Sequence, residues 1–231
     1  VYFIIMIIAS FQYRVPAEGW KPKGYTPPTP EESAAKMKTL DNVHINQAIK
    51  TPQFYQLWIV LCFNVSAGIG VIGVAKTMMS EIFGSAPSGT ELASIVTATF
   101  AGTYVLMISV FNMCGRIIWA SLSDFIGRKN TYHCFFVIGT LLYLSIPFTA
   151  SAVSVNPSVM YLVMFYAATM IIFTMYGGGF ATIPAYLADM FGTMHVGGIH
   201  GRLLTAWSTA GVLGPFAITY LRNMSVTDSI N

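Results

Sequence analysis

Charge is the scarcest property of this sequence. Charged residues make up 9% of the 231 positions, whereas hydrophobic residues make up 55% and aromatic residues 14%. Several charge-poor runs are longer than the roughly 18 residues that a helix needs to cross the hydrocarbon core of a bilayer. This composition excludes an ordinary soluble domain and is typical of an integral membrane protein.

Residue sets for catalysis or metal binding are also lacking. Cys62, Cys114 and Cys134 lie in apolar runs without C-x-x-C spacing, so neither a disulfide nor a metal site is predicted. His195 and His200 are five residues apart with no carboxylate at metal spacing, which favours a solvated loop. The sequence shows no Ser-His-Asp or Cys-His set. We therefore predict no enzyme activity, no cofactor and no nucleic-acid partner.

A glycine pattern in one apolar run invites two interpretations. Gly68, Gly70 and Gly73 match the Gly-x-Gly-x-x-Gly fingerprint of dinucleotide-binding folds. That fingerprint needs a strand before it, whereas these glycines lie inside a predicted membrane span. Close packing between helices, or local unwinding of the helix, is therefore the favoured interpretation.

Charge-poor runs and helix-start signals divide the chain into predicted membrane spans. Residues 1–13 lack the basic start and cleavage site of a signal peptide, so we expect them to be the end of a span in a fragment of a longer protein. Thr51-Pro52 and the capping box Ser88-x-x-Glu91 are start signals for helices. Five complete spans are predicted, at about 54–83, 92–121, 131–150, 158–182 and 203–221, followed by an external tail at 222–231.

The loop at residues 14–53 sets the predicted orientation. It contains six of the twelve Lys and Arg residues, and basic residues concentrate in the cytoplasmic loops of membrane proteins. We therefore place it in the cytoplasm of a multi-pass protein of the cell membrane. A short helix is predicted from Thr29-Pro30 to Leu40, residues 184–202 form a second cytoplasmic loop, and Gly214-Pro215 predicts a kink in the last span.

Arg116 stands alone in a charge-free run. No charge occurs from Leu92 to Gly115, and the eight positions to Asp124 place Arg116 roughly 12 Å inside that end of the span. A guanidinium cannot lose its proton there, and it normally faces a cavity or an anion. Its helical face is shared by three polar residues, at i−7, i−4 and i+7: Ser109, Asn112 and Ser123. This polar stripe predicts a wet interior.

The residues that follow Arg116 form a recognisable motif. Ser121-Leu-Ser-Asp-Phe-Ile-Gly-Arg-Lys129, with Gly115 ahead of it, resembles the signature loop of the major facilitator superfamily, G-x-x-x-D-x-x-G-R-[KR]. A carboxylate suits a helix end, a glycine permits the sharp turn, and basic residues suit the cytoplasmic surface. The predicted gating residues of this loop are Gly115, Ser123, Asp124, Gly127, Arg128 and Lys129.

The rest of the chain is similar to one group of that superfamily. Residues 51–54, 112–129 and 184–192 resemble the carboxyl-terminal half of transporters in the oxalate/formate antiporter group, close to the monocarboxylate transporters. The resemblance implies an all-α major facilitator fold that holds the end of span six, the central loop and spans seven to eleven. It also implies that span twelve and the amino-terminal half, which would be a partner in the lipid bilayer, are missing.

The resemblance further implies a substrate site. An arginine at the position of Arg116 is understood to bind a substrate carboxylate in this family, and Asn112 would add a hydrogen bond. Oxalate carriers of the group have a lysine after Thr205-Ala206, whereas this chain has Trp207, so a monocarboxylate is favoured over a dianion. The remaining candidates are Lys76, which could instead snorkel to the external surface, and Phe173, Tyr176 and Trp207, which could instead be core residues.

Two functions remain open on the sequence alone. The first is a secondary transporter of small organic carboxylate anions that works by alternating access, with the energy supplied by a counter-anion or by protons. The second is a non-transporting membrane receptor or a truncated subunit, in which Arg116 is part of a structural ion pair. Carboxylate uptake into vesicles distinguishes them.

Overall fold

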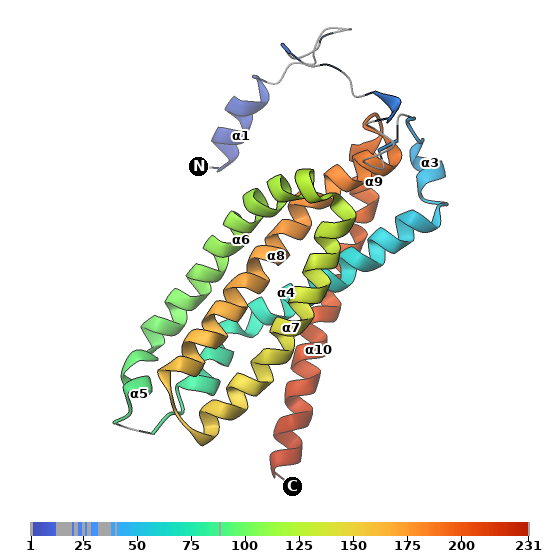
Figure 1. Cartoon of the computed structure of the whole chain (residues 1–231). Helices are drawn as coiled ribbons and strands as arrows, with labels where there is room; N and C mark the ends of the chain where they lie inside the picture. Colours follow the sequence, from blue (N-terminus) through green and yellow to red (C-terminus); the bar gives the residue numbers. More distant parts are fainter. Residues whose placement is uncertain are drawn as a thin grey trace.

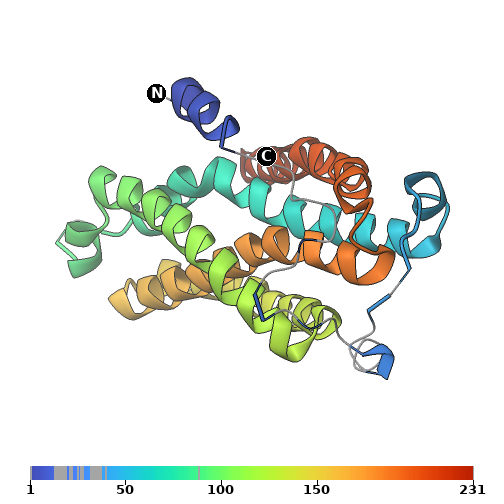
Figure 2. The same cartoon turned by 90° about the horizontal axis from the view of Figure 1, so that it is seen from above.

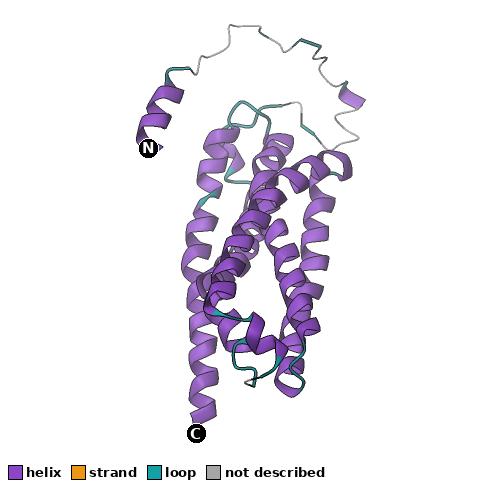
Figure 3. Ribbon diagram, turned by 90° about the vertical axis from the view of Figure 1, so that its left-hand side faces the viewer, coloured by secondary structure: helices purple, strands orange, loops and turns teal. Residues whose placement is uncertain are grey.

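The described part of the chain is helical. The computed structural model describes residues 2–12, 41–87 and 89–230, together with residues 20, 23–24, 26, 29–31 and 38–39, and none of these lies in a strand (Figure 3). The described elements, labelled in Figure 1, are α1 (Tyr2–Ser10), α3 (Ile45–Ala48), α4 (Pro52–Phe83), α5 (Glu91–Ile95), α6 (Ala98–Ile126), α7 (Arg128–Val155), α8 (Val159–Phe191), α9 (Val196–Leu203) and α10 (Thr205–Ile230). The helix predicted to end at Leu40 falls largely outside these residues.

Four described helices are long and apolar enough to cross a membrane, namely α4, α6, α7 and α8. They contain 28 to 33 residues, and a helix of about 20 residues already spans the hydrocarbon core. The fifth predicted span corresponds to α10, which has 26 residues but is rich in threonine, serine and glycine and does not reach the same apolarity. α10 also continues through Pro215, where a kink was predicted.

Threonine side chains cap the first turns of α4, α5 and α6. Thr51 Oγ1 accepts a hydrogen bond of 3.4 Å from the backbone N–H of Phe54 at the start of α4, next to Pro52 in the first turn, as the sequence predicted. Thr90 caps α5, and Thr97 caps α6 by accepting from Phe100 N at 3.2 Å. The predicted span at 92–121 is therefore two helices, because a second cap restarts the chain at Thr97. Ser88, the predicted cap, lies outside the described residues.

The helices extend further than predicted toward the signature loop. α8 passes through Pro184 to Phe191, so most of the predicted loop at 184–202 is helix, because the burial of neighbouring apolar side chains outweighs the one backbone hydrogen bond that a proline removes. α8 ends at Gly192, whose φ of +82° suits glycine.

His200 lies in α9 and not in a solvated loop. Its Nδ1 atom is buried, and burial lowers the pKa of its imidazole below the usual value.

The bundle is built from two close helix pairs. α6 packs along α8 and α4 packs along α10, while α7 lies against α8, as the view from above shows (Figure 2). At the α4–α10 contact, a Cβ on Gly70 would lie 2.9 Å from Ile218 Cγ1, and one on Gly214 would lie 2.6 Å from the carbonyl oxygen of Ser66. Gly68 lies instead against α8, where a Cβ would collide with the ring of Tyr176. Close packing between helices is therefore confirmed at Gly68 and Gly70, whereas Gly73 has open space around it.

A second close approach joins α6 to α8, and we call it the glycine seam: Gly115 on α6 with Gly177 and Gly178 on α8. A side chain on Gly115 would collide with the backbone of Thr174, and one on Gly177 would collide with the carbonyl oxygen of Asn112. The indole N–H of Trp119 crosses the seam and donates to Thr174 Oγ1 at 3.1 Å. The seam therefore holds the middle of α6, where Asn112 and Arg116 lie, directly against α8.

One end of the bundle contains the signature loop. α6 meets α7 at Gly127, α4 begins at Pro52, and α8 ends at Phe191, all at the same end (Figure 1). This is the signature-loop end, which the sequence predicts to be cytoplasmic. The opposite end carries α5.

Candidate functional site

Arg116 lies two-thirds of the way along α6 with its side chain exposed. Its Nε donates a hydrogen bond of 3.3 Å to Asn112 Oδ1, one turn earlier on the same face, and its Cζ lies 5.6 Å from the centre of the Phe180 ring on α8. Within the described residues, Arg116 has no carboxylate partner. One amide and one aromatic ring therefore orient a full positive charge that no anion neutralises.

Phe180 is the centre of an aromatic row that includes three of the predicted residues. Its ring lies 5.2 Å from Tyr176 on α8 and 5.2 Å from Trp207 on α10, both edge to face, and Phe173 lies 6.1 Å behind Tyr176. The sequence interpretation did not include Phe180. Its spacing of four residues from Tyr176, which places both on one helical face, was the signal that could have found it.

The aromatic row runs from the core to the open surface beside Arg116. Phe173 is fully buried and Tyr176 nearly so, with its ring against Gly68 on α4, whereas Trp207 is 46% exposed. Phe173 therefore supports Tyr176 from behind and does not reach the surface itself. Lys76 lies elsewhere on α4. It is exposed, and the described contacts do not join it to Arg116 or to the aromatic row.

The signature loop is held by one arginine between two carboxylates. Gly127 makes the turn with φ +87°, and Arg128 then forms an ion pair with Asp124 and a hydrogen bond with Ser123. Arg128 Nε also lies 3.3 Å from Asp189 Oδ2 at the end of α8. Asp189 was not among the predicted site residues, although it stands in the 184–192 segment that carried the family resemblance. Lys129 is exposed and takes part in no ion pair within the described part of the chain.

The chain just before α4 packs onto this network. Lys38 Nζ lies 3.4 Å from Asp189 Oδ1, and the backbone N–H of Thr39 donates to the Asp189 carbonyl at 2.8 Å. Val43 N donates to Phe191 O at 2.9 Å, and Met194 N donates to Asn42 Oδ1 at 3.1 Å. The last part of the predicted central loop is therefore attached to the turn between α8 and α9.

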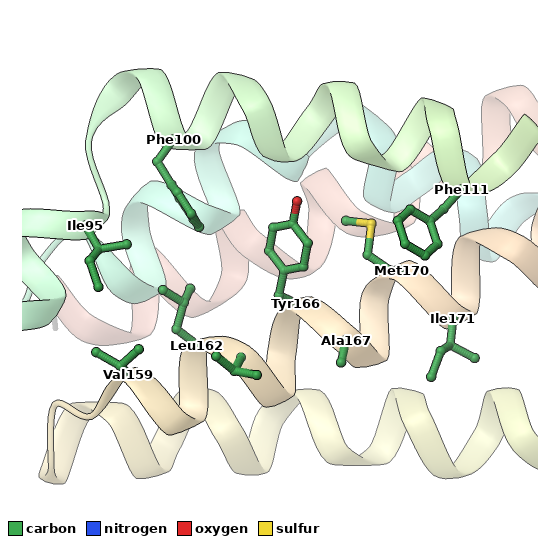
Figure 4. Close-up of a pocket in the computed structure, with 10 residues that line it drawn as sticks. Ile95, Phe100, Phe111, Val159, Leu162, Tyr166, Ala167, Met170 and Ile171 are labelled. Atoms are coloured by element: carbon green, nitrogen blue, oxygen red, sulfur yellow. The ribbon is translucent and has the colours of Figure 1, made fainter.

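A cavity with a volume of about 520 Å³ lies between α6 and α8, on a different face of these helices from Arg116 and Phe180 (Figure 4). Two lining residues show this difference in face. Ile171 precedes Phe180 by nine residues on α8, and Phe111 precedes Arg116 by five residues on α6. At about 100° per residue, Ile171 and Phe111 therefore lie roughly on the opposite sides of their helices from Phe180 and Arg116. All its lining residues are apolar except Tyr166: Ile95, Phe100, Phe111, Val159, Leu162, Val163, Tyr166, Ala167, Met170 and Ile171. Without a cation, this cavity does not suit an anion despite its size.

Comparison with known proteins identifies the family. The sequence profile described as Major Facilitator Superfamily matches residues 1–222. The chain belongs to the major facilitator superfamily. As a member of this superfamily it is a multi-pass membrane protein from a family of transporters, and the resemblance of its signature loop is confirmed.

One individual protein is also similar to this chain. The oxalate:formate antiporter of Oxalobacter formigenes is 27% identical over 213 residues, which are 91% of this chain and 43% of that protein. The predicted similarity to the oxalate/formate antiporter group is thereby confirmed. The chain spans less than half the length of this relative.

Proposed function

We propose that the chain is the carboxyl-terminal half of a secondary transporter that moves small organic carboxylate anions by alternating access. The observation that carries this proposal is Arg116, an exposed arginine on a membrane-spanning helix, which is oriented by Asn112 and Phe180 and has no carboxylate partner within the described residues. Ionisable residues within membrane spans are commonly functional because they are costly to keep there.

The contacts of Arg116 leave room for a carboxylate. Asn112 occupies Nε, and the Phe180 ring lies near Cζ, so the terminal nitrogens have no partner within the described residues. A guanidinium binds a carboxylate through two parallel N–H···O bonds, which fix the anion in one orientation. Asn112 would then keep the guanidinium in place and contribute its own amide N–H group as a second donor.

The aromatic row supports a singly charged substrate. Trp207 occupies the position where oxalate carriers of the group have a lysine, and it presents a half-exposed indole next to Phe180. A dianion beside one arginine would keep an unneutralised charge against aromatic rings, which is costly. A small monocarboxylate fits this surface better, with exchange for another anion or proton symport as the source of energy. The name of the relative, which is an antiporter, favours exchange.

The decisive test is Arg116→Lys in the complete protein. Lysine keeps the charge but loses the planar fork, so one of two charge-assisted bonds is lost and carboxylate affinity should fall roughly tenfold to a hundredfold. The melting temperature should change little, because Arg116 has no structural ion pair in the described residues. Binding and melting temperature should be measured on the same purified sample.

Arg222→Lys is the matched control. Arg222 is another exposed arginine, on α10, and it pairs with Glu81 on α4 away from the proposed site. Its substitution should leave carboxylate affinity unchanged. Normal affinity with a lowered melting temperature in Arg116→Lys would instead show that Arg116 pairs with a carboxylate of the other half, as expected for a receptor or a subunit that does not transport.

A further inference from the structure

A cavity of about 190 Å³ at the signature-loop end has a different character from the apolar one. It lies between the first turns of α4 and α7, and the last turns of α8 close it. Polar side chains stand at its mouth: Gln53 and Gln56 on α4, and Lys129 and His133 on α7. All four are exposed, and within the described residues none has a side-chain hydrogen bond or ion pair. The mouth therefore offers one cation and several N–H donors to a ligand.

The lining changes from polar to apolar with depth. Beyond Gln56 on α4 the cavity is lined by Leu57 and Val60, and beyond His133 on α7 it is lined by Phe136. The remaining lining residues are Tyr132, Tyr186 and Met190. The rise of a helix places Val60 roughly 10 Å from Gln53 along the axis of α4. Over about the same distance a bilayer passes from its headgroups to its acyl chains. The cavity therefore matches a ligand with a polar head and an apolar tail.

The electrostatics of the mouth favour a negative head. α4 and α7 both begin there, so the positive ends of two long helices meet at the cavity, and no side chain caps the first N–H groups of α7. Two carboxylates at this end are already paired, since Asp124 binds Arg128 and Asp189 binds both Arg128 and Lys38. Lys129 thus remains available to an anion.

We propose that this cavity binds an anionic phospholipid. The phosphate would lie between Lys129 and His133, with the glutamines as additional donors, and the start of one acyl chain would follow Leu57, Val60 and Phe136. Basic pockets between membrane helices on the cytoplasmic side are suited to anionic headgroups, and this is the end that the sequence predicts to be cytoplasmic. The inference does not depend on the proposed substrate, because the cavity lies apart from Arg116.

The test measures lipid binding by the complete protein, purified in detergent, with native mass spectrometry. Phosphatidylglycerol should bind more tightly than phosphatidylcholine with the same chains. Lys129→Gln should weaken phosphatidylglycerol binding roughly fivefold, because one lysine near an anionic headgroup contributes about that factor. Binding of phosphatidylcholine should stay the same. Lys50→Gln is the matched control, since Lys50 is an exposed lysine at the same end that does not line the cavity.

Two further measurements make the result decisive. Adding His133→Gln to Lys129→Gln should reduce phosphatidylglycerol binding further than Lys129→Gln alone. The melting temperature without lipid should be unchanged by either substitution, because both side chains are exposed. Equal binding of the two lipids, or equal losses in the Lys129 and Lys50 variants, would overturn the proposal. Glycerol phosphate tested alone should not compete at concentrations where phosphatidylglycerol does; effective competition would show that the cavity takes a free organic phosphate and would overturn the lipid assignment.

Discussion

Arg116 and Arg128 are twelve residues apart in the sequence, yet their surroundings differ in every respect. Arg128 is 12% exposed and lies between the carboxylates of Asp124 and Asp189. Arg116 is exposed, and it has an amide and an aromatic ring but no anion within the described residues. The first arrangement is complete within the chain. The second contains no negative charge within the described residues, which is why we propose a structural role for Arg128 and a binding role for Arg116.

Removing Arg128 should give the largest effect. In Arg128→Met the Asp189 carboxylate, which is 16% exposed, would lose its partner at Oδ2 and keep only Lys38. Breaking a largely buried ion pair leaves a carboxylate that Lys38 neutralises from one side, so the unfolding free energy should fall by about 3 kcal/mol. Denaturant unfolding of the purified protein measures this loss. Lys129→Met, which removes a neighbouring cation without an ion pair, should cost less than about 0.5 kcal/mol; equal losses would remove the contrast between paired and unpaired cations.

Removing the ring beside Arg116 should have an intermediate effect, on binding and not on folding. Phe180→Leu keeps an apolar side chain but abolishes the cation–π contact and the edge contact with Trp207. Carboxylate affinity should fall roughly threefold to tenfold. Isothermal titration would detect this change, and Phe216→Leu on α10, whose ring stacks only on Tyr220 among the described rings, serves as the control. An unchanged affinity in Phe180→Leu would show that the aromatic row does not contribute to carboxylate binding at Arg116.

Asp124→Asn should change stability much less than Arg128→Met does. The Asp124 side chain is 62% exposed, and a pair with such an exposed member contributes less than about 1 kcal/mol. We nevertheless expect the maximal transport rate to fall roughly fivefold, because a carboxylate at a helix end can stabilise one access state without touching the substrate. Uptake kinetics in vesicles would show an unchanged half-saturation constant. A raised constant with an unchanged maximal rate would place Asp124 in the binding site.

Local spacing made part of the site predictable. Asn112 precedes Arg116 by four residues, and helical geometry alone brings the two side chains together, as the hydrogen bond between them shows. The start of α4 at Thr51-Pro52 depends on the same local chemistry of caps. The fold class followed from charge-poor runs and from the signature loop, because crossing a bilayer requires helices whose backbone groups are satisfied internally.

Contacts between distant segments were not predictable in this way. Phe180 becomes important because α8 packs against α6, which carries Arg116, and contacts α10, which carries Trp207. Asp189 becomes important because the end of α8 reaches the signature loop. Thr39 and Val43 attach to the end of α8 through their backbone N–H groups, which carry no signal in the sequence. The predicted end of the fourth span was wrong for a related reason. A proline usually ends a helix, but the burial of neighbouring side chains allows α8 to continue through Pro184.

The glycine seam has a mechanical consequence. Because Gly115 and Gly177 bring the backbones of α6 and α8 into contact, neither helix can slide or rotate against the other without collisions between main-chain atoms. A spin label on α6 and another on α8 would therefore keep their separation throughout a transport cycle, while labels that span the two halves would not. Arg116 and Phe180 would travel as one piece, so the site would be opened to either side of the membrane without being taken apart.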